Sequence, residues 1–134
     1  MGVANLRAGG LDLSERVLAT DIKTVRDNPK LKLSKAVQLG YLGLTMNVAN
    51  GAKADTPLGK DARVRRALEL SIDREAMNQV VFNGEFVPGN QWINPTNPYY
   101  QHAYPIPTRD IARATASCQH ADVPTPLALI LPVP

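Results

Sequence analysis

The stretch Asp61–Phe82, DARVRRALELSIDREAMNQVVF, decides the fold because it is the longest segment with continuous helical periodicity. Apolar residues recur along its first half at the spacing of one helical face, which predicts a helix packed on a core. Asp61 is the predicted N-cap of this helix. The predicted apolar stripe consists of Val64, Ala67, Leu68, Ser71 and Ile72.

A second helix is predicted directly after the first. Asp73 is a suitable N-cap, and Met77, Val80 and Val81 continue an apolar face. Gly84 is suited to the left-handed conformation that ends many helices. The segment therefore predicts two short helices that meet near Leu70–Asp73.

The N-terminal part predicts a helix followed by two strands. Asp12 or Ser14 would cap a helix that buries Leu18, Ile22 and Val25 and ends at Asn28–Pro29, after a loosely held Met1–Gly10. Alternation predicts a half-buried strand at Leu31–Leu33, and apolar character predicts a longer one at Val37–Val48. Gly40 and Gly43 interrupt the longer strand and indicate either a place where the chain flexes or a tight packing contact.

The C-terminal part predicts an ordered surface loop, a helix and a strand. Glu85–Pro107 is rich in proline, which excludes a regular helix, yet it carries the single Trp and three of the four Tyr. Thr108 would cap a helix over Arg109–Ala116, and Leu127–Leu131 has the composition of a buried strand.

The segment RVRRALELSIDREAMNQVVFNGEFVPG, which starts at Arg63, closely resembles a segment of the family 5 extracellular solute-binding proteins. These are the peptide, nickel and opine receptors of ABC importers. LRAGGLDLSERV and LGYLGLTMNVANGAKADTPLGKDARVRRAL before it, and NPTNPYY, PTRDIARATAS and ADVPTPLALILPVP after it, resemble the family in the same order. The chain departs from the pattern at Ser117–Cys118 and at Ala121–Asp122, where the family has two apolar residues and then Ala-Gly.

The resemblance implies an α/β fold, in which short helices pack on a small mixed sheet. The chain would be a middle fragment of a class II periplasmic-binding-protein-like receptor. Residues 1–36 would end the first lobe, and residues 37–134 would form part of the second. A self-contained helical bundle with no β-sheet for the paired helices to cover would overturn this assignment.

The resemblance also implies the function, which is solute binding in an ABC import system. The family binds by closing two lobes over a solute, without chemistry, so we expect neither an enzyme nor a cofactor. The implied partners are a peptide or similar small solute and ABC permease subunits, in the periplasm or another extracytoplasmic space. Tyr41–Asn47 would be a strand that crosses between the lobes.

The candidate ligand-binding residues lie on the side of that strand facing the cleft and in the aromatic loop. Asn47 would alternatively hydrogen-bond its own backbone to start a turn. Trp92 would alternatively pin its loop to the domain. The candidates are Tyr41, Leu42, Leu44, Asn47 and Trp92.

Other classes of function have weaker support. The net charge of +3 comes from interspersed charges of both signs. A small basic helical module that binds nucleic acid through Arg63, Arg65 and Arg66 is the alternative, although neighbouring acids offset these charges and no aromatic residue is interleaved.

The remaining residues with chemical potential form no recognisable site. Cys118 and His120 point apart on a helix and are expected at the surface, where they form no thiol-enzyme pair. The histidines and acids lack metal-site spacing, and one cysteine cannot form an internal disulfide. From its N-terminal composition we expect no signal peptide in this stretch, and we expect no membrane-spanning run. Exposed strand edges predict self-association.

Overall fold

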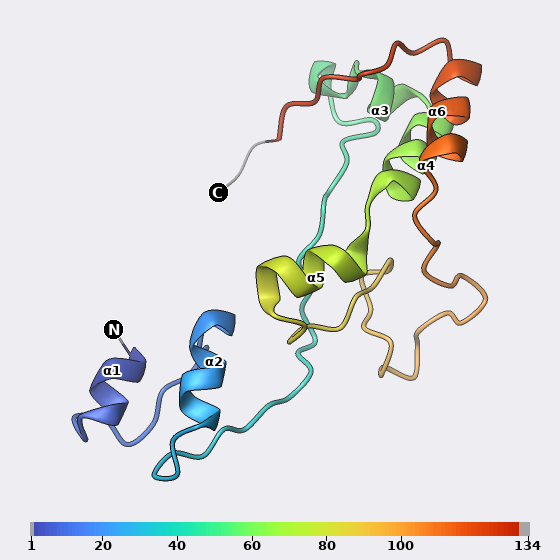
Figure 1. Ribbon diagram of the computed structural model, residues 1–134. Helices are drawn as coiled ribbons and strands as arrows, with labels where there is room; N and C mark the ends of the chain where they lie inside the picture. The colour runs from blue at the N-terminus through green and yellow to red at the C-terminus, as the bar shows by residue number, and fades with distance from the viewer. Residues whose placement is uncertain (1, 132–134) are drawn as a thin grey trace. The chain divides into compact units, whose positions relative to one another are not determined.

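The computed structural model describes residues 2–131, and within that range the regular structure is entirely helical (Figure 1). The elements in chain order are α1 (Gly2–Arg7), α2 (Ala19–Arg26), the short 3-10 helix η1 (Ala52–Ala54), α3 (Pro57–Lys60), α4 (Ala62–Ser71), α5 (Arg74–Phe82) and α6 (Ile111–His120). None of these helices has the length and apolar character of a membrane-crossing segment.

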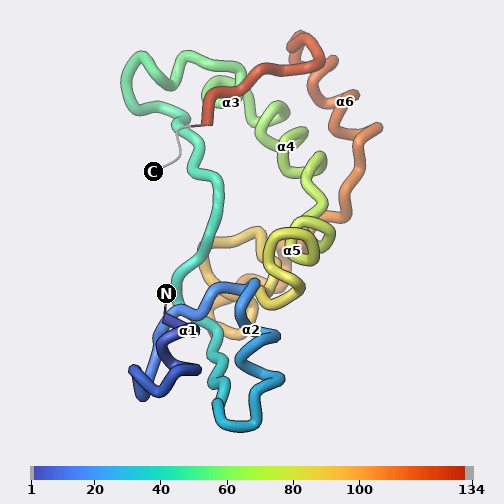
Figure 2. Tube along the Cα trace, turned by 60° about the vertical axis from the view of Figure 1, so that its left-hand side comes forward, coloured from blue at the N-terminus to red at the C-terminus, as the bar shows by residue number. Residues whose placement is uncertain are grey.

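The chain divides into two compact units, each built from two separated stretches. The first unit contains the residues up to Tyr41 together with Arg74–Gln101. The second contains Leu42–Asp73 together with the residues from His102 onward. The chain therefore passes between the units three times, and one of these crossings separates α4 from α5; Figure 2 traces this path.

The predicted small mixed sheet is wrong for the described part of the chain. Leu31–Leu33, Val37–Val48 and Leu127–Leu131 contain no strand. Alternating or apolar sequence favours an extended backbone, but a β-ladder also needs a second segment to pair with. The side chains expected on the buried faces are open to solvent, with exposed fractions of 84% for Leu39 and 97% for Ile130.

The two helices predicted from the central segment are confirmed, but the apolar face predicted for the second is wrong, because Met77, Val80 and Val81 are 50%, 82% and 54% exposed. α4 ends at Ser71 and α5 begins at Arg74. The Asp61 carboxylate caps α4 by accepting the Arg63 backbone N–H at 2.7 Å. Gly84 has a φ of +73° just after the end of α5, the left-handed conformation expected there.

The core of the second unit forms where α4 packs against α6, which lie side by side in Figures 1 and 2. Val64 and Ala67 are buried as the apolar stripe predicts, but Leu70 is buried as well, with 2% of its surface exposed. The interface between the helices consists of Ala67, Leu70, Ala114 and Cys118.

The predicted limits of the first and last helices were wrong. An additional helix, α1, occupies part of the predicted loose segment, and α2 begins at Ala19 rather than after Asp12 or Ser14. α6 is capped by Asp110, whose carboxylate accepts the Arg113 N–H at 2.9 Å, and not by Thr108. The segment before α6 offers more than one capping side chain, so local sequence does not decide between Thr108 and Asp110. α2 begins after Leu18 without any side-chain cap.

The C-terminus of α6 adopts a standard stop without glycine. The Asp122 N–H donates to the Gln119 carbonyl and the Val123 N–H donates to the Cys118 carbonyl, both at 3.0 Å. This is the Schellman pattern, and Asp122 occupies its left-handed position with a φ of +54°. The helix end therefore keeps its geometry even though the chain lacks the glycine usual at this position.

Candidate functional site

The five candidate ligand-binding residues are all exposed, but they belong to different units. Tyr41 and Trp92 lie in the first unit and are 62% and 72% exposed. Leu42, Leu44 and Asn47 lie in the second. Asn47 forms a turn, because its side chain accepts the Asn50 N–H at 2.8 Å and donates to the Asn50 carbonyl at 3.0 Å.

Asn94 joins the Trp92 loop to the segment that leads to Tyr41. Its Nδ2 donates to the Gln38 carbonyl at 3.0 Å. Its Oδ1 accepts the Thr96 N–H at 3.0 Å and the Thr96 hydroxyl at 2.6 Å. The Asn94 side chain therefore stabilises the turn of the loop and also binds the backbone of the segment that leads to Tyr41. The Asn-Pro pair predicts the turn, but not the contact with Gln38.

Side-chain hydrogen bonds join the two ends of the loop that carries Trp92. Gln91 and Gln101 bond reciprocally, because Gln91 Nε2 donates to the Gln101 carbonyl at 2.9 Å and Gln91 Oε1 accepts the Gln101 N–H at 3.2 Å. The Tyr100 hydroxyl donates to Asn90 Oδ1 at 3.3 Å. These contacts order the loop while the indole of Trp92 remains largely exposed, which does not support the alternative in which Trp92 pins the loop.

Glu85 anchors the same unit through two ion pairs. Its carboxylate accepts from Arg26 at 3.0 Å and from Lys35 at 2.9 Å, and only 14% of its side chain is exposed. Hydrogen bonds from Lys35 and then from Arg26 hold the pKa of Glu85 below its ordinary value. Glu85 thereby connects the end of α2, the segment near Lys35 and the chain after α5. The sequence gives no signal for this role, because the partners of Glu85 are distant along the chain.

A buried amide supports the position of Glu85. Asn78 of α5 is 7% exposed. Its Nδ2 donates to the Phe86 carbonyl at 2.8 Å, and its Oδ1 accepts the Phe86 N–H at 3.2 Å. The rings of Phe82 and Phe86 meet edge to face, with centroids 4.4 Å apart. The chain on the C-terminal side of α5 is therefore fixed on both sides of Glu85.

The three arginines proposed for nucleic-acid binding are engaged within the second unit. Arg63 pairs with Asp61 at 2.6 Å and also donates to the His120 carbonyl. Arg65 donates to the Leu58 and Gly59 carbonyls at 2.8 and 3.1 Å, and Arg66 pairs with Glu69.

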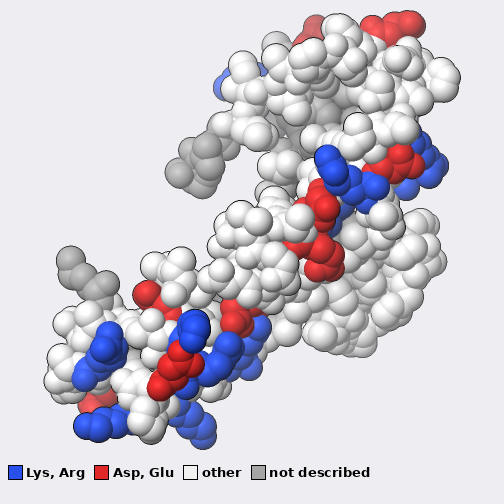
Figure 3. Space-filling model, viewed as in Figure 1, with Lys and Arg blue, Asp and Glu red and all other residues white. Residues whose placement is uncertain are grey.

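This pairing affects ionisation and disfavours a nucleic-acid surface. The hydrogen bond from the Arg63 side chain lowers the pKa of Asp61, and the same bond raises the pKa of Arg63. Figure 3 shows basic and acidic side chains next to one another and not a continuous basic face. Phosphate binding would have to break contacts that already satisfy these guanidinium groups.

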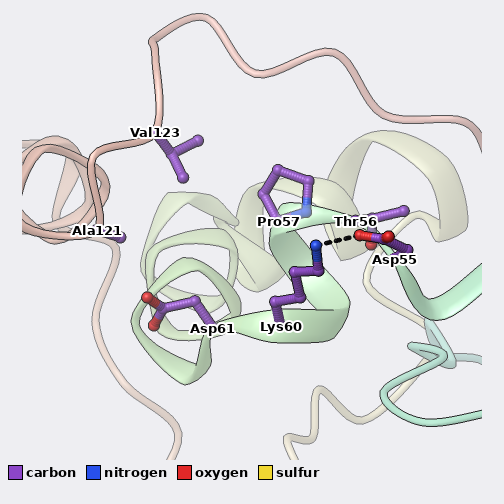
Figure 4. Close-up of a pocket in the computed structure, with 7 residues that line it drawn as sticks. All are labelled: Asp55, Thr56, Pro57, Lys60, Asp61, Ala121 and Val123. Carbon is purple, nitrogen blue, oxygen red and sulfur yellow. Dashed lines mark ion pairs between the residues drawn. The ribbon is translucent and has the colours of Figure 1, made fainter.

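A shallow hollow of about 300 Å³ lies near α3 in the second unit (Figure 4). The charged groups at this hollow are already paired, because Lys60 forms an ion pair with Asp55 and Asp61 binds Arg63. The hollow therefore offers no free charge for a ligand. It is lined by Asp55, Thr56, Pro57, Lys60, Asp61, Ala121 and Val123.

The predicted surface position of Cys118 is wrong. Its side chain is buried between α4 and α6 with 8% exposed, since α6 extends further than predicted and turns Cys118 toward Leu70 and Ala67. His120 is exposed as expected. A buried thiol behaves as a small apolar side chain, so Cys118 is a core residue. Residues 2–131 contain no cluster of three or more His, Cys, Asp or Glu suited to a metal ion.

Comparison with known proteins identifies the family. The model of the bacterial extracellular solute-binding proteins, family 5 Middle, matches residues 2–129. The oligopeptide-binding protein AppA of Bacillus subtilis (strain 168) is 35% identical over 83 residues, which are 62% of this chain and 14% of that protein. No solved structure matches the chain. The chain thus spans a small part of its relative's length, and it belongs to the family 5 bacterial extracellular solute-binding proteins.

Proposed function

We propose that this chain is part of the solute-binding component of an ABC import system, and that its solutes are peptides or similar small molecules. The observation that carries the proposal is the family match over residues 2–129. The similarity to a protein named for binding oligopeptides supports peptides as the solute class.

The proposed mechanism is closure of two lobes around the solute, with no covalent step and no cofactor. Residues 1–36 would end the first lobe, and residues 37–134 would belong to the second. ABC permease subunits would be the protein partners, and the site of action would be periplasmic or extracytoplasmic. The family's extracellular description supports this location.

The proposed solute contacts are the exposed side chains of the crossing segment and the aromatic loop. The bond between Asn94 and Gln38 supports a joint role for Tyr41 and Trp92, because it ties the two parts of one unit together. Asn47 would fix the turn at the end of the segment. The proposed contact residues are Tyr41, Leu42, Leu44, Asn47 and Trp92.

The test is a binding measurement on the polypeptide produced from the whole reading frame that contains this chain. Isothermal titration calorimetry with a pool of short peptides should give saturable heat. Tyr41→Ala and Trp92→Ala should each weaken binding by about tenfold. Tyr104→Ala is the control, since this tyrosine is similarly exposed, at 68%, but is not a proposed contact. The absence of saturable heat with every peptide pool would refute the function.

We also propose that the isolated chain self-associates. Val37–Val48 contains no charged residue, and its exposed side chains include Leu39 at 84% and Leu42 at 80%. Exposed apolar segments without charged residues tend to pair with another chain. Pairing of this segment between two copies, by strand exchange, would cover it.

A further inference from the structure

The chain from Phe86 to Gln101 contains no Asp, Glu, Lys or Arg, although such residues make up 20% of the whole sequence. This stretch forms the closed loop of the first unit, which is drawn in yellow and orange in Figure 1. Its polar groups are amides and hydroxyls. The loop therefore presents polar but uncharged chemistry.

Two aromatic rings are exposed on this loop. Trp92 is 72% exposed and Tyr99 is 76% exposed. Both lie close in sequence to Gln91 and Gln101, whose hydrogen bonds join the two ends of the loop. The Tyr99 N–H also donates to Asn97 Oδ1 at 2.9 Å. Because the backbone that carries the rings is already ordered, little entropy is lost when a ligand contacts them.

The adjacent carboxylate does not provide a charge for a ligand. Glu85 precedes the loop, but Arg26 and Lys35 already hold its carboxylate. A charged ligand group placed against the loop would lose water without gaining an opposite charge. An aromatic or aliphatic group would lose no such hydration and would stack on the rings.

We propose that the surface of Trp92 and Tyr99 selects solutes by binding an uncharged aromatic or large aliphatic side chain of a peptide. This inference rests on the proposed function and defines the class of peptide. Charged side chains are disfavoured at this position because the loop cannot compensate their charge. The surface thus acts as a specificity element through ring stacking and through the absence of charge.

The single tryptophan of the chain makes a direct test possible. The 134-residue chain is titrated with blocked tripeptides Gly-X-Gly, where X is Phe, Leu, Lys or Asp, while Trp92 emission and acrylamide quenching are recorded. Blocked ends remove the terminal charges. The Phe and Leu peptides should protect Trp92 at concentrations about fivefold lower than the Lys and Asp peptides.

Two variants separate a specific surface from a general aromatic effect. Tyr99→Ala should remove the advantage of the Phe peptide. Tyr104→Ala, which changes an exposed ring outside Phe86–Gln101, should leave the advantage of the Phe peptide unchanged.

Three results would overturn the proposal: equal protection by all four peptides, protection by none, or stronger protection by the Lys peptide. Stronger protection by the Lys peptide would show that the face of the Trp92 indole attracts a cation. Saturable calorimetric heat combined with any of these results would leave the proposed function intact and reject only this selectivity.

Discussion

The Arg63 guanidinium donates to the carbonyl oxygen of His120, which lies 57 positions later in the sequence. The same guanidinium pairs with Asp61, the N-cap of α4. Arg63 therefore connects the start of α4 to the last residue of α6. This contact lies at the edge of the only extensive helix–helix packing in the described residues.

Replacing Arg63 should loosen the packing of α6 on α4. Arg63→Ala removes donors from the α6 carbonyl end and from the Asp61 carboxylate, and should lower Tm by about 2–4 °C. Circular dichroism during thermal unfolding measures the effect. Lys30→Ala, another exposed basic residue, should leave Tm unchanged. An equal decrease in Tm for Arg63→Ala and Lys30→Ala would show that stability depends only on the total charge and not on the contacts of Arg63.

Asp122→Gly should stabilise the chain. Asp122 holds a left-handed backbone conformation at the end of α6, which glycine adopts without a steric penalty. The expected gain in the free energy of unfolding is about 0.5 kcal/mol, measured by urea denaturation. Asp122→Ala should instead destabilise, because alanine keeps the β-carbon and loses the polar side chain. A loss of stability in the glycine variant would mean that the electrostatic attraction between Asp122 and Arg63 outweighs the backbone strain.

The Glu85 ion pairs should make stability depend on acid pH. Lys35 and Arg26 lower the pKa of Glu85 below its ordinary value of 4.5, so the unfolded chain binds the proton more readily than the folded chain. The stabilisation is therefore complete above pH 4.5 and is lost as the pH falls through the lowered folded-state pKa. Glu85→Gln should reduce the acid-induced loss of Tm, whereas Glu75→Gln, at an exposed position of α5, should not. Identical pH profiles for Glu85→Gln and the unsubstituted chain would contradict this role.

Self-association should depend on the uncharged segment Val37–Val48. Size-exclusion chromatography with light scattering should show a mass above the monomer at micromolar concentration. Leu42→Lys should restore the monomer, because pairing would bring two like charges together. Val80→Lys adds the same charge at an equally exposed site on α5, and should leave the assembly intact. A monomeric unsubstituted chain would refute the prediction.

Local sequence predicted the features that depend on neighbouring residues. The separation of α4 from α5, the Asp61 cap and the left-handed Gly84 follow from helical periodicity and from backbone preferences. The buried position of Leu70 was missed because the stripe was drawn through its neighbours, although its distance from Ala67 is also a helical spacing.

Features that depend on distant residues were not predictable in this way. Glu85 binds groups 50 and 59 positions away, and Asn94 bonds to Gln38, and neither pairing leaves a periodic signal. The sheet was predicted from segments that have suitable composition but no pairing partner within residues 2–131. A structure without a sheet was expected to overturn the family assignment, and residues 2–131 contain no strand. The family model nevertheless matches residues 2–129, so the assignment rests on the match along the sequence.

The three passages of the chain between the compact units also constrain how the molecule is made. Neither unit is a continuous piece of polypeptide, so no single truncation can isolate one of them whole. During synthesis, α1 and α2 must wait for α5 and the aromatic loop to leave the ribosome before their unit is complete. The amino-terminal stretch therefore cannot complete the packing of its unit until the stretch ending at Gln101 has emerged.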